Sequence, residues 1–531
     1  MRPGTFAPLQ CLRAPILTSV TNRTQAATEH LDVVVVGAGL SGVGAGYRLQ
    51  TECPDKTYAI LESRAGIGGT WDLFRYPGIR SDSDIFTLAY PFEPWQEKES
   101  IVDGAAIRRY IETTAAKHGI DAHIRLNRRV VAADWSSHAQ RWAVTVETTG
   151  DSGAAPAERT TMTCSFLYAC SGYYDYGAAH AAAIPGIADF GGDVVHPQFW
   201  PEDLEYAGKR VVVIGSGATA VTMVPSMAQE AERVTMLQRT PSWIAVAPRV
   251  DKLANSLRER LPEQLAHRLI RTKNVLLTQA LFQFCQRFPL QAKKLLLQNV
   301  EKGVGSDNFD AADFTAPYDP WDQRLCLVPG GDLFKAVRRG KAEIVTDRIG
   351  GFTADGVELE SGRSLPADIV VTATGLKLQL FGGVQPSVDG QTITLSEQFV
   401  WRGAMITGLP NLALCVGYIN ASWTLRADLS SRLVCKILNH LDARDLGAVV
   451  PPYEEGLVER PLLGLTSGYV TRALPMLPRQ GDKGVWRVRQ NYVVDVVTTL
   501  RTDLDATLAP IARTAVDSGG PKVRHHLTPM D

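Results

Sequence analysis

The sequence lacks the features that mark several classes of protein. Its formal net charge is −1, which provides no electrostatic footprint for nucleic acid. No apolar run reaches the length that spans a bilayer. The eight cysteines are scattered, without a C-x-x-C pair or metal-ligand spacing. We therefore expect free or buried thiols, no metal site, no nucleic-acid partner and a cytoplasmic location.

The first 30 residues differ in composition from the rest of the chain. They contain Arg2, Arg13 and Arg23 and no acid before Glu29, which is typical of an organellar transit peptide. A disordered N-terminal extension and an upstream start-codon artefact are the alternatives. We exclude this segment from the fold, together with a C-terminal tail at residues 514–531.

A glycine-rich turn follows the first apolar strand. Residues 32–36 are a short β-branched run, typical of a buried parallel strand. Gly37, Gly39 and Gly42 then give the pattern G-x-G-x-x-G, whose glycines permit a tight turn, close approach to a pyrophosphate and close packing of the next helix. Ser41 lies in the first helical turn, where free amides favour phosphate.

The second predicted strand, residues 58–62, ends in a carboxylate. Glu62 lies about 20 residues beyond Gly42, where an acceptor for ribose hydroxyls is expected. A solvated acid at a strand end is the alternative interpretation. With the strand before the glycines and the helix after them, Glu62 predicts a dinucleotide site.

The same pattern recurs in the middle of the chain. An apolar strand at residues 210–214 is followed by a turn in which alanine is the third small residue. The residues of this turn that we expect to contact a second dinucleotide are Gly215, Ser216, Gly217, Thr219 and Ala220.

The strand that follows the second glycine turn ends in a base rather than an acid. Arg239 and Thr240 occupy the place that Glu62 has after the first turn. A carboxylate accepts ribose hydroxyls and repels a 2′-phosphate, whereas arginine beside a hydroxyl favours that phosphate. The first motif is therefore predicted to bind FAD and the second NADPH. The alternative is that Arg239 merely ends a strand.

The chain, at 531 residues, is long enough for two or three domains. We expect an α/β protein with two Rossmann-like dinucleotide-binding domains, for FAD and NADPH, and a helical insertion. The FAD-binding domain is predicted to comprise residues 31–175 and 373–513, and the NADPH-binding domain residues 185–245 and 318–372. The helical insertion is predicted at residues 246–317, between the two segments of the NADPH-binding domain.

The predicted insertion is rich in helix-forming and basic residues. Leucines and phenylalanines alternate there with bases, and the preferred interpretation is a set of helices packed on the nucleotide domain. A basic amphipathic surface for membranes or apolar substrates is the alternative. The bases are Arg268, Arg271, Lys273, Arg287, Lys293 and Lys294.

Two longer patterns accompany the dinucleotide motifs. G-G-x-W-x-x-x-x-Y-P-G-x-x-x-D extends from Gly68 to Asp82. The pattern F-x-G-x-x-x-H-x-x-x-W-P lies between the two glycine turns, with Phe190, Gly192, His196, Trp200 and Pro201. Together they resemble the fingerprints of the Baeyer–Villiger flavin monooxygenases, a class B flavoprotein family. The resemblance extends from about residue 31 to about residue 486, and several stretches are similar to a mycobacterial member.

The resemblance implies a reaction and its reactants. NADPH would reduce FAD, dioxygen would add to the reduced flavin, and the peroxyflavin would attack a small-molecule ketone to give an ester or lactone. Oxygenation of sulfur or nitrogen in sulfides, thioamides or amines is the alternative within the same site. The sequence does not identify the physiological substrate or the oligomeric state.

The resemblance also assigns roles to single residues. Arg324 would be the active-site arginine that stabilises the anionic peroxide, and Asp82 would set its position. Arg80 would contact the nicotinamide nucleotide, and the backbone of Val130 would meet the adenine. The residues expected to line the flavin are Gly69, Thr70, Trp71 and Asp72.

The fingerprint residues have a different expected role from the residues that line the flavin. His196 and Trp200 are expected to orient the two domains rather than to take part in the chemistry. One departure from the family pattern concerns Gln323, which stands where many members have a lysine that assists with the 2′-phosphate. Preference for NADPH would then rest on Arg239 and Thr240.

Two functions outside oxygenation remain as alternatives. A flavin disulfide reductase needs a pair of redox cysteines, and Trp71 stands in the G-G-T-x context where such enzymes place a cysteine. A flavin-binding sensor without turnover is the other alternative. Two complete nucleotide motifs together with Arg324 argue against it.

Overall fold

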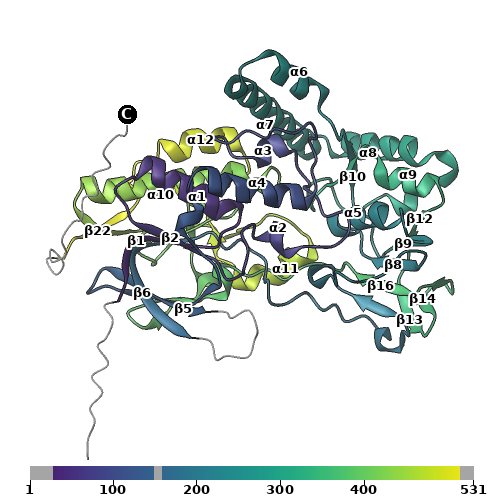
Figure 1. The fold of residues 1–531 in the computed structure, drawn as a ribbon, viewed down its shortest axis with the longest axis horizontal. Helices are drawn as coiled ribbons and strands as arrows, with labels where there is room; N and C mark the ends of the chain where they lie inside the picture. Colours follow the sequence, from purple (N-terminus) through teal and green to yellow (C-terminus); the bar gives the residue numbers. More distant parts are fainter. Residues whose placement is uncertain (1–27, 149–157, 515–531) are drawn as a thin grey trace, which may run out of the picture.

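The computed structural model describes residues 28–148 and 158–514, and its chain forms two α/β lobes side by side (Figure 1). The predictions made above for the first 27 residues and for residues 515–531 lie outside the described residues. Within the described residues, one lobe contains an eleven-stranded sheet and the other a five-stranded sheet.

The centre of the larger sheet is the strand that precedes the first glycine turn. β1 (His30–Val36) pairs in parallel with β2 (Tyr58–Leu61) on one side and β6 (Arg159–Ala169) on the other. Val33, Val34 and Val35 are buried because both faces of the sheet are covered. β3 (Ile124–Arg125) extends the parallel region beyond β2, and β21 (Leu412–Leu414) pairs in parallel with β6.

The same sheet continues into an antiparallel region beyond β6. Trp135 and Trp142 face each other in the register between β4 and β5, and both are fully buried. The strands of this region and of the attached hairpins are β4 (Arg128–Ser136), β5 (Arg141–Thr148), β17 (Pro386–Val388), β18 (Gln391–Thr392), β19 (Val400–Trp401) and β20 (Met405–Ile406).

The smaller sheet is parallel, and the strand before the second glycine turn lies at its centre. Its order is β12-β9-β8-β16-β7, so β8 (Arg210–Ile214) lies between β9 (Arg233–Gln238) and β16 (Ile369–Thr372). The edges are β12 (Ala342–Thr346) and β7 (Asp193–Val195). Small accessory sheets accompany it, formed by β10 (Ile244–Ala247), β11 (Cys326–Pro329), β13 (Ile349–Thr353), β14 (Gly356–Leu359) and β15 (Ser364–Pro366).

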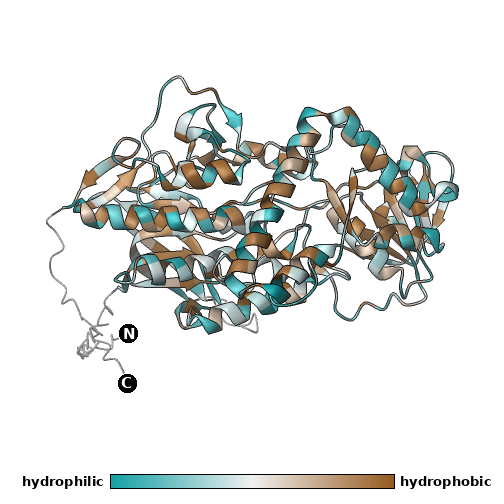
Figure 2. Cartoon of the chain, turned by 90° about the horizontal axis from the view of Figure 1, so that it is seen from above, coloured by the Kyte–Doolittle hydropathy of each residue, from teal (hydrophilic) through white to brown (hydrophobic). Residues whose placement is uncertain are grey.

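Helices cover the strands, which are the most hydrophobic elements of each lobe (Figure 2). In Figure 1, α1, α4 and α10 lie together on one side of β1, β2 and β6. The helices and the remaining strands of the larger lobe are α1 (Leu40–Glu52), α2 (Thr70–Leu73), α3 (Ile85–Leu88), α4 (Gly104–Lys117), α10 (Trp423–Ala443), α11 (Gly468–Ala473), α12 (Tyr492–Leu500), β22 (Leu446–Val450), β23 (Arg460–Pro461), β24 (Arg479–Gln480) and β25 (Ala509–Ala512).

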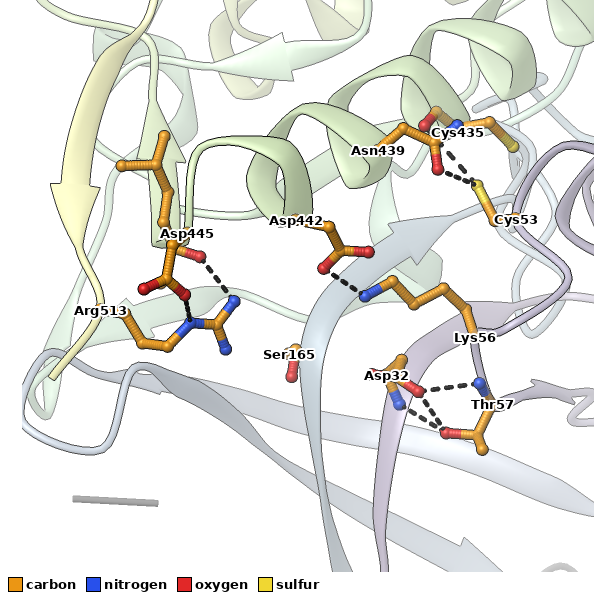
Figure 3. A network of polar contacts seen from close by, with 12 residues as sticks. Asp32, Cys53, Lys56, Thr57, Ser165, Cys435, Asn439, Asp442, Asp445 and Arg513 are labelled. Carbon is orange, nitrogen blue, oxygen red and sulfur yellow. Dashed lines mark hydrogen bonds and ion pairs between the residues drawn. The ribbon is translucent and has the colours of Figure 1, made fainter. Parts of the chain in front are cut away.

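Polar contacts hold the end of α10 to the parallel region of the larger sheet (Figure 3). Lys56 Nζ lies 2.7 Å from the carboxylate of Asp442, and the Cys53 thiol donates to the backbone carbonyl of Cys435. Asp32 accepts from the amide and hydroxyl of Thr57. The seven described cysteines are buried and free, and among the described side chains no cluster could hold a metal ion.

Helices of the predicted insertion project from the smaller lobe toward the top of Figure 1. They are α6 (Lys252–Arg260), α7 (Glu263–Arg287) and α8 (Pro289–Val304). Two further helices of the smaller lobe, α5 (Ala218–Met227) and α9 (Asp332–Arg338), connect strands of the lobe. Nowhere in residues 28–148 and 158–514 does a helix combine the length and apolar character needed to cross a membrane.

Two chain segments connect the lobes and lie side by side. The segment after β6 and the segment after β16 form an antiparallel bridge between Tyr174 and Leu378. The amide of Asp175 donates to the carbonyl of Lys377, whose ammonium lies 2.8 Å from the Asp175 carboxylate. The two paired connections hold the lobes against each other, and both glycine turns lie near the junction.

Candidate active site

The two glycine turns are built in the same way. Gly37 has φ +100° and Gly215 has φ +143°, conformations that favour glycine. A Cβ at Gly37 would lie 2.9 Å from the carbonyl oxygen of Cys170, and one at Gly215 would lie 2.4 Å from that of Ala373. Each turn therefore passes directly over the end of the neighbouring parallel strand.

The first turn is closed by a glycine and by a carboxylate. A Cβ at Gly42 would lie 1.9 Å from the carbonyl oxygen of Gly37, so α1 packs on the turn without space for a methyl group. Glu62 accepts from the amides of Ala38 (2.8 Å) and Arg64 (2.9 Å). Burial raises the pKa of Glu62, and these amide hydrogen bonds oppose that rise.

One cavity of about 710 Å³ connects the two turns. Twelve of the predicted residues lie in its wall, although they come from segments far apart in the chain. They are Gly37, Gly39, Ser41, Glu62, Gly69, Thr70, Trp71, Arg80, Asp82, Val130, Thr219 and Arg324. The other predicted cofactor residues lie outside the wall: Gly42, Asp72, Gly215, Ser216, Gly217, Ala220, Arg239 and Thr240.

The ion pair between Arg324 and Asp82 lies in the wall of this cavity. The two residues are 242 positions apart, and the guanidinium contacts both carboxylate oxygens, Nη2 to Oδ1 at 2.9 Å and Nε to Oδ2 at 2.6 Å. Such a fork is a rigid, oriented arrangement. Burial lowers the pKa of Arg324, but Asp82 and the surrounding tyrosines more than compensate and raise it above its ordinary value. Arg324 is therefore a permanent, fixed cation.

Aromatic side chains surround the guanidinium. The ring of Tyr173 stacks on Trp423 with centroids 5.0 Å apart, and its hydroxyl lies 3.2 Å from that of Tyr174. Burial raises the pKa of both tyrosines, so their hydroxyls stay protonated. Trp423 donates its indole N–H to Ser41 Oγ at 2.8 Å, which ties this wall to the first helix.

A second, much smaller cavity lies beside Arg324. Tyr173, Trp423 and Arg324 belong to the walls of both cavities, so these side chains separate the two spaces. The rest of the smaller wall is mostly aliphatic and aromatic, with Val416, Tyr418, Ile419, Leu463, Leu465, Tyr469 and Val470. The fixed cation thus lies between a polar dinucleotide cavity and an apolar space.

Asp72 has partners within the protein rather than a position in the cavity wall. Its buried carboxylate lies 2.8 Å from Nε of Arg64, 2.9 Å from Arg75 and 3.2 Å from Arg108. Arg64 itself lines the cavity. Asp72 therefore fixes the direction of the Arg64 guanidinium at the cavity wall.

Arg80 connects the two lobes. It lines the cavity and forms an ion pair with Asp332, the first residue of α9 in the smaller lobe. Its Nη2 is buried and has no hydrogen-bond partner within the described structure. A buried guanidinium N–H without a partner is costly, so this donor is suited to a ligand in the cavity.

The second glycine turn is hydrogen-bonded to the loop that follows β9. Ser216 Oγ donates to the carbonyl of Thr240 at 2.8 Å and lies 3.0 Å from Ser242 Oγ. Its hydroxyl is therefore used to shape the loop that carries Arg239. Arg239 is exposed and forms no ion pair within the described stretches of the chain, which leaves its guanidinium free for a phosphate.

Gly217→Ala should separate cofactor binding from folding. The residue has φ −79°, and a Cβ there would meet no protein atom within 4 Å. The chain should tolerate the methyl group, whereas a pyrophosphate that approaches the backbone should not. We expect the KM for NADPH to rise about ten-fold or more with unchanged flavin content and melting temperature. An unchanged KM would contradict this, and Gly351→Ala is the matched control because its Cβ also meets open space.

The fingerprint residues form the edge of the smaller sheet beside the connection between the lobes. Phe190 packs on Phe352, and a Cβ at Gly192 would lie 2.3 Å from the carbonyl oxygen of Asp368. His196 Nδ1 accepts from the amide of Gln198 at 3.1 Å, and burial lowers the pKa of His196. Trp200 packs against the core of the smaller lobe. None of the four lies in the wall of either cavity described here.

The His196 turn reaches the larger lobe through its neighbour. Gln198 is buried and donates its side-chain amide to the carbonyl of Asp175 at 2.7 Å. Asp175 lies in the segment that connects the lobes and also lines the cavity. The arrangement supports an orienting role for the fingerprint and not a chemical one.

Several cavity residues were not predicted from the sequence. Arg64, Arg128 and Arg129 line the end of the cavity near Glu62, and Tyr173 and Tyr176 line its middle. The position of Arg64, two residues after the strand-end acid, was an available signal. No pattern in the sequence distinguished the tyrosines from core aromatics.

The residues present fit two bound dinucleotides. Each turn leads into a helix whose first residues, Leu40 and Ser41 of α1 and Ala218 and Thr219 of α5, lie in the cavity wall, and bases accompany both turns. The fold and this site define a flavoprotein oxidoreductase with two dinucleotide-binding lobes.

Comparison with known proteins agrees with this class. The Flavin-binding monooxygenase-like family profile matches residues 86–269, and the NAD(P)-binding Rossmann-like domain profile matches residues 35–96. The chain is 50% identical over 481 residues to the FAD-containing monooxygenase EthA of Mycobacterium tuberculosis, covering 90% of this chain and 97% of that protein. It is 42% identical to the probable FAD-binding monooxygenase AlmA of Acinetobacter baylyi, and the match covers 88% of this chain and 93% of that protein. The chain belongs to the FAD-containing monooxygenase family.

Solved structures show the same fold at much lower identity. Oxidized steroid monooxygenase bound to NADP superposes with a TM-score of 0.69 at 22% identity, covering 91% of this chain and 100% of that chain. The polycyclic ketone monooxygenase of the thermophilic fungus Thermothelomyces thermophila superposes with a TM-score of 0.69 at 16% identity. The match covers 92% of this chain and 90% of that chain. These likenesses confirm the predicted α/β fold with two Rossmann-like lobes.

Proposed function

We propose that this FAD- and NADPH-dependent monooxygenase inserts one atom of dioxygen beside the carbonyl of a ketone, the Baeyer–Villiger reaction, and releases an ester or lactone. The observation that carries the proposal is the Arg324–Asp82 fork between the dinucleotide cavity and the apolar space. When bound, FAD reduced by NADPH supplies the activation of dioxygen.

Arg324 would stabilise negative charge that develops on oxygen during the reaction. A cation fixed in place before the reaction avoids the cost of reorganisation and is most effective where water is excluded. Asp82 holds the guanidinium in one direction, and Tyr173 and Trp423 restrict the space around it. These residues position and stabilise, and none needs to exchange a proton.

The apolar space beside Arg324 supports a ketone as the substrate class. The lining residues other than Arg324 are uncharged, so they suit the apolar body of a carbonyl compound. The space is about 10 Å³, room for a water-sized group, so one end of a substrate would enter it and the rest would lie in the larger cavity. Two structural neighbours are named as a steroid monooxygenase and a polycyclic ketone monooxygenase, which supports the same class.

Oxygenation of sulfur or nitrogen is the second candidate function. It would need neutral hydrogen-bond donors beside the reacting oxygen rather than a cation alone. Tyr173 and Tyr174 provide hydroxyls that keep their protons, because burial raises the pKa of both. Both reactions would use the same cavity.

A direct competition separates the two candidates. Purified enzyme with NADPH and air would be given a cyclic ketone and an aryl methyl sulfide, together and separately, and the products quantified. Ester or lactone formation at a rate that accounts for the NADPH consumed supports the first candidate. Sulfoxide as the sole product, with NADPH consumption unaffected by the ketone, would replace it with the second.

Arg239→Ala tests the assignment of NADPH to the second turn. Arg239 is exposed and directly follows β9, in the loop whose Thr240 carbonyl accepts from Ser216. Because hydrogen bonds to a charged partner contribute more than neutral ones, we expect the KM for NADPH to rise about ten-fold to 100-fold. The KM for NADH, which lacks the 2′-phosphate, should change little. Equal changes for both coenzymes would remove the phosphate assignment, and Arg339→Ala, at an exposed base after α9, is the control.

A further inference from the structure

The insertion carries a row of exposed apolar side chains, called here the insertion face. It comprises Leu265, Leu269 and Leu276 of α7, Phe288 at the junction, and Leu290 of α8. Their exposed fractions run from 45% to 75%. A soluble surface seldom gathers so many large apolar residues unless it contacts a partner or a membrane.

Helical geometry shows that the insertion face is not the packing face of α7. At 3.6 residues per turn, Leu265, Leu269 and Leu276 fall within about 40° of one another around the axis. The side about 120° to 180° away contains Ile270, Asn274 and His267, which are buried. α7 therefore packs within the chain on that side and presents the three leucines on the other.

Within residues 264–300 of the insertion, all charged side chains are bases. Residues 264–300 contain no aspartate or glutamate. Three of the bases in this stretch have internal partners: Arg271 donates to the carbonyls of Phe86, Thr87 and Ala89, Lys273 pairs with Asp251, and Lys293 lies 2.6 Å from Asp319.

The other three bases of the stretch, Arg268, Arg287 and Lys294, face solvent. They have no ion pair among the residues that the structure describes. Arg268 lies within the leucine row of α7, Arg287 is the last residue of α7, and Lys294 lies on α8. The insertion face is thus an apolar strip flanked by unpaired positive charge.

We propose that the insertion face docks on the surface of an anionic lipid bilayer. Leucines and phenylalanine would enter the boundary between headgroups and acyl chains, while the arginines and the lysine would keep their charges among the anionic headgroups. The interaction is that of helices lying on a membrane, and it goes beyond the oxygenation proposed above.

Charge complementarity distinguishes a bilayer from a second copy of the chain. A two-fold contact through the insertion face would bring the same patch together from both copies. Arg268, Arg287 and Lys294 would then meet equal charges, without any acid from residues 264–300 to offset them. An anionic bilayer offers an apolar boundary to the leucines and opposite charge to the bases.

Flotation of the intact FAD-loaded enzyme with lipid vesicles tests the proposal. Vesicles of phosphatidylcholine alone and of phosphatidylcholine mixed with phosphatidylglycerol would be compared at low and high salt. We expect binding only to the anionic vesicles, weakened by salt because exposed charges are screened. Flavin content and NADPH oxidation in solution would verify that each variant is folded.

Two triple variants separate the apolar and the electrostatic contributions. The apolar variant is Leu265→Ser, Leu269→Ser and Leu276→Ser, and the charge variant is Arg268→Gln, Arg287→Gln and Lys294→Gln. Because the six side chains are exposed, folding should be unaffected. We expect each variant to lower the partition coefficient on anionic vesicles by about 100-fold.

Matched controls alter exposed residues elsewhere on the chain. The apolar control is Tyr453→Ser, Val458→Ser and Met476→Ser, and the charge control is Lys335→Gln, Arg339→Gln and Lys341→Gln. Both should float like the unaltered enzyme. Equal binding by the test variants and the controls, or no binding to anionic vesicles, would overturn the proposal. Self-association in solution that the apolar variant abolishes would also overturn it and assign the face to a second copy.

Discussion

Arg324→Ala is expected to keep bound FAD and to lose ester formation. The guanidinium lies in the wall of the dinucleotide cavity and is held by both oxygens of Asp82, but the glycine turn and Glu62 are formed by other segments. Removing a fixed charge that faces developing negative charge costs about 100-fold or more in kcat. Ketone turnover should fall by at least this factor, while NADPH should still reduce the flavin.

Arg324→Lys and Arg324→Ala/Asp82→Ala are the controls for this prediction. Lysine retains the charge but loses the fork that contacts both carboxylate oxygens, so its ester formation should lie between those of the wild type and the alanine variant. The double variant removes the acid that Arg324→Ala leaves unpaired, and it should remain inactive if the defect is chemical. Full ketone oxygenation by Arg324→Ala would remove the assigned role.

Gly42→Ala is expected to abolish flavin retention. The new Cβ would lie 1.9 Å from the carbonyl oxygen of Gly37, a backbone atom that cannot move without opening the turn. Overpacking of this kind costs about 3 kcal/mol or more, and it falls on the turn that approaches the FAD pyrophosphate. The ratio of flavin to protein absorbance after purification should fall to near zero, with a lower melting temperature.

Gly464→Ala is the control for that experiment because its Cβ meets no atom within 4 Å. It should purify with the normal flavin content. Gly42→Ala protein that retains stoichiometric flavin would show that α1 can shift away from the turn. The close packing of helix and strand would then not be what positions the pyrophosphate.

The local features of the two motifs were predictable from the sequence. Gly37 and Gly215 follow buried strands, and the positive φ of each has the steric cause that the pattern implies. Glu62 follows the second strand and lies in the cavity wall. The glycines and the strand-end acid lie within one βαβ unit, so spacing along the chain is sufficient to find them, whereas the strand ends that each turn passes over come from distant segments.

Features that depend on competition between distant partners were less accessible. Asp72 could have faced the flavin, but three arginines occupy its carboxylate. The hydroxyl of Ser216 could have faced a phosphate, but it donates to the carbonyl of Thr240. In both cases an amino-acid pattern identifies a polar group near the site, and only the packing decides which partner it takes.

The pairing of Arg324 with Asp82 came from the family resemblance and not from any local pattern. Its partners are separated by 242 positions and lie on different lobes, so their contact depends on how the lobes are joined. The aromatic wall formed by Tyr173 and Trp423 likewise joins residues from distant segments of the chain. Physical reasoning on isolated segments cannot place such groups, because no segment contains both.

Labelled dioxygen provides the most direct test of the central claim. Purified enzyme would be incubated with NADPH, ¹⁸O₂ and a panel of aliphatic, aryl and cyclic ketones, and the products analysed by mass spectrometry. We predict an ester or lactone that carries one labelled atom, formed in proportion to the NADPH consumed and absent with Arg324→Ala. Substrate-independent NADPH oxidation with unlabelled, unchanged ketone throughout the panel would contradict the account.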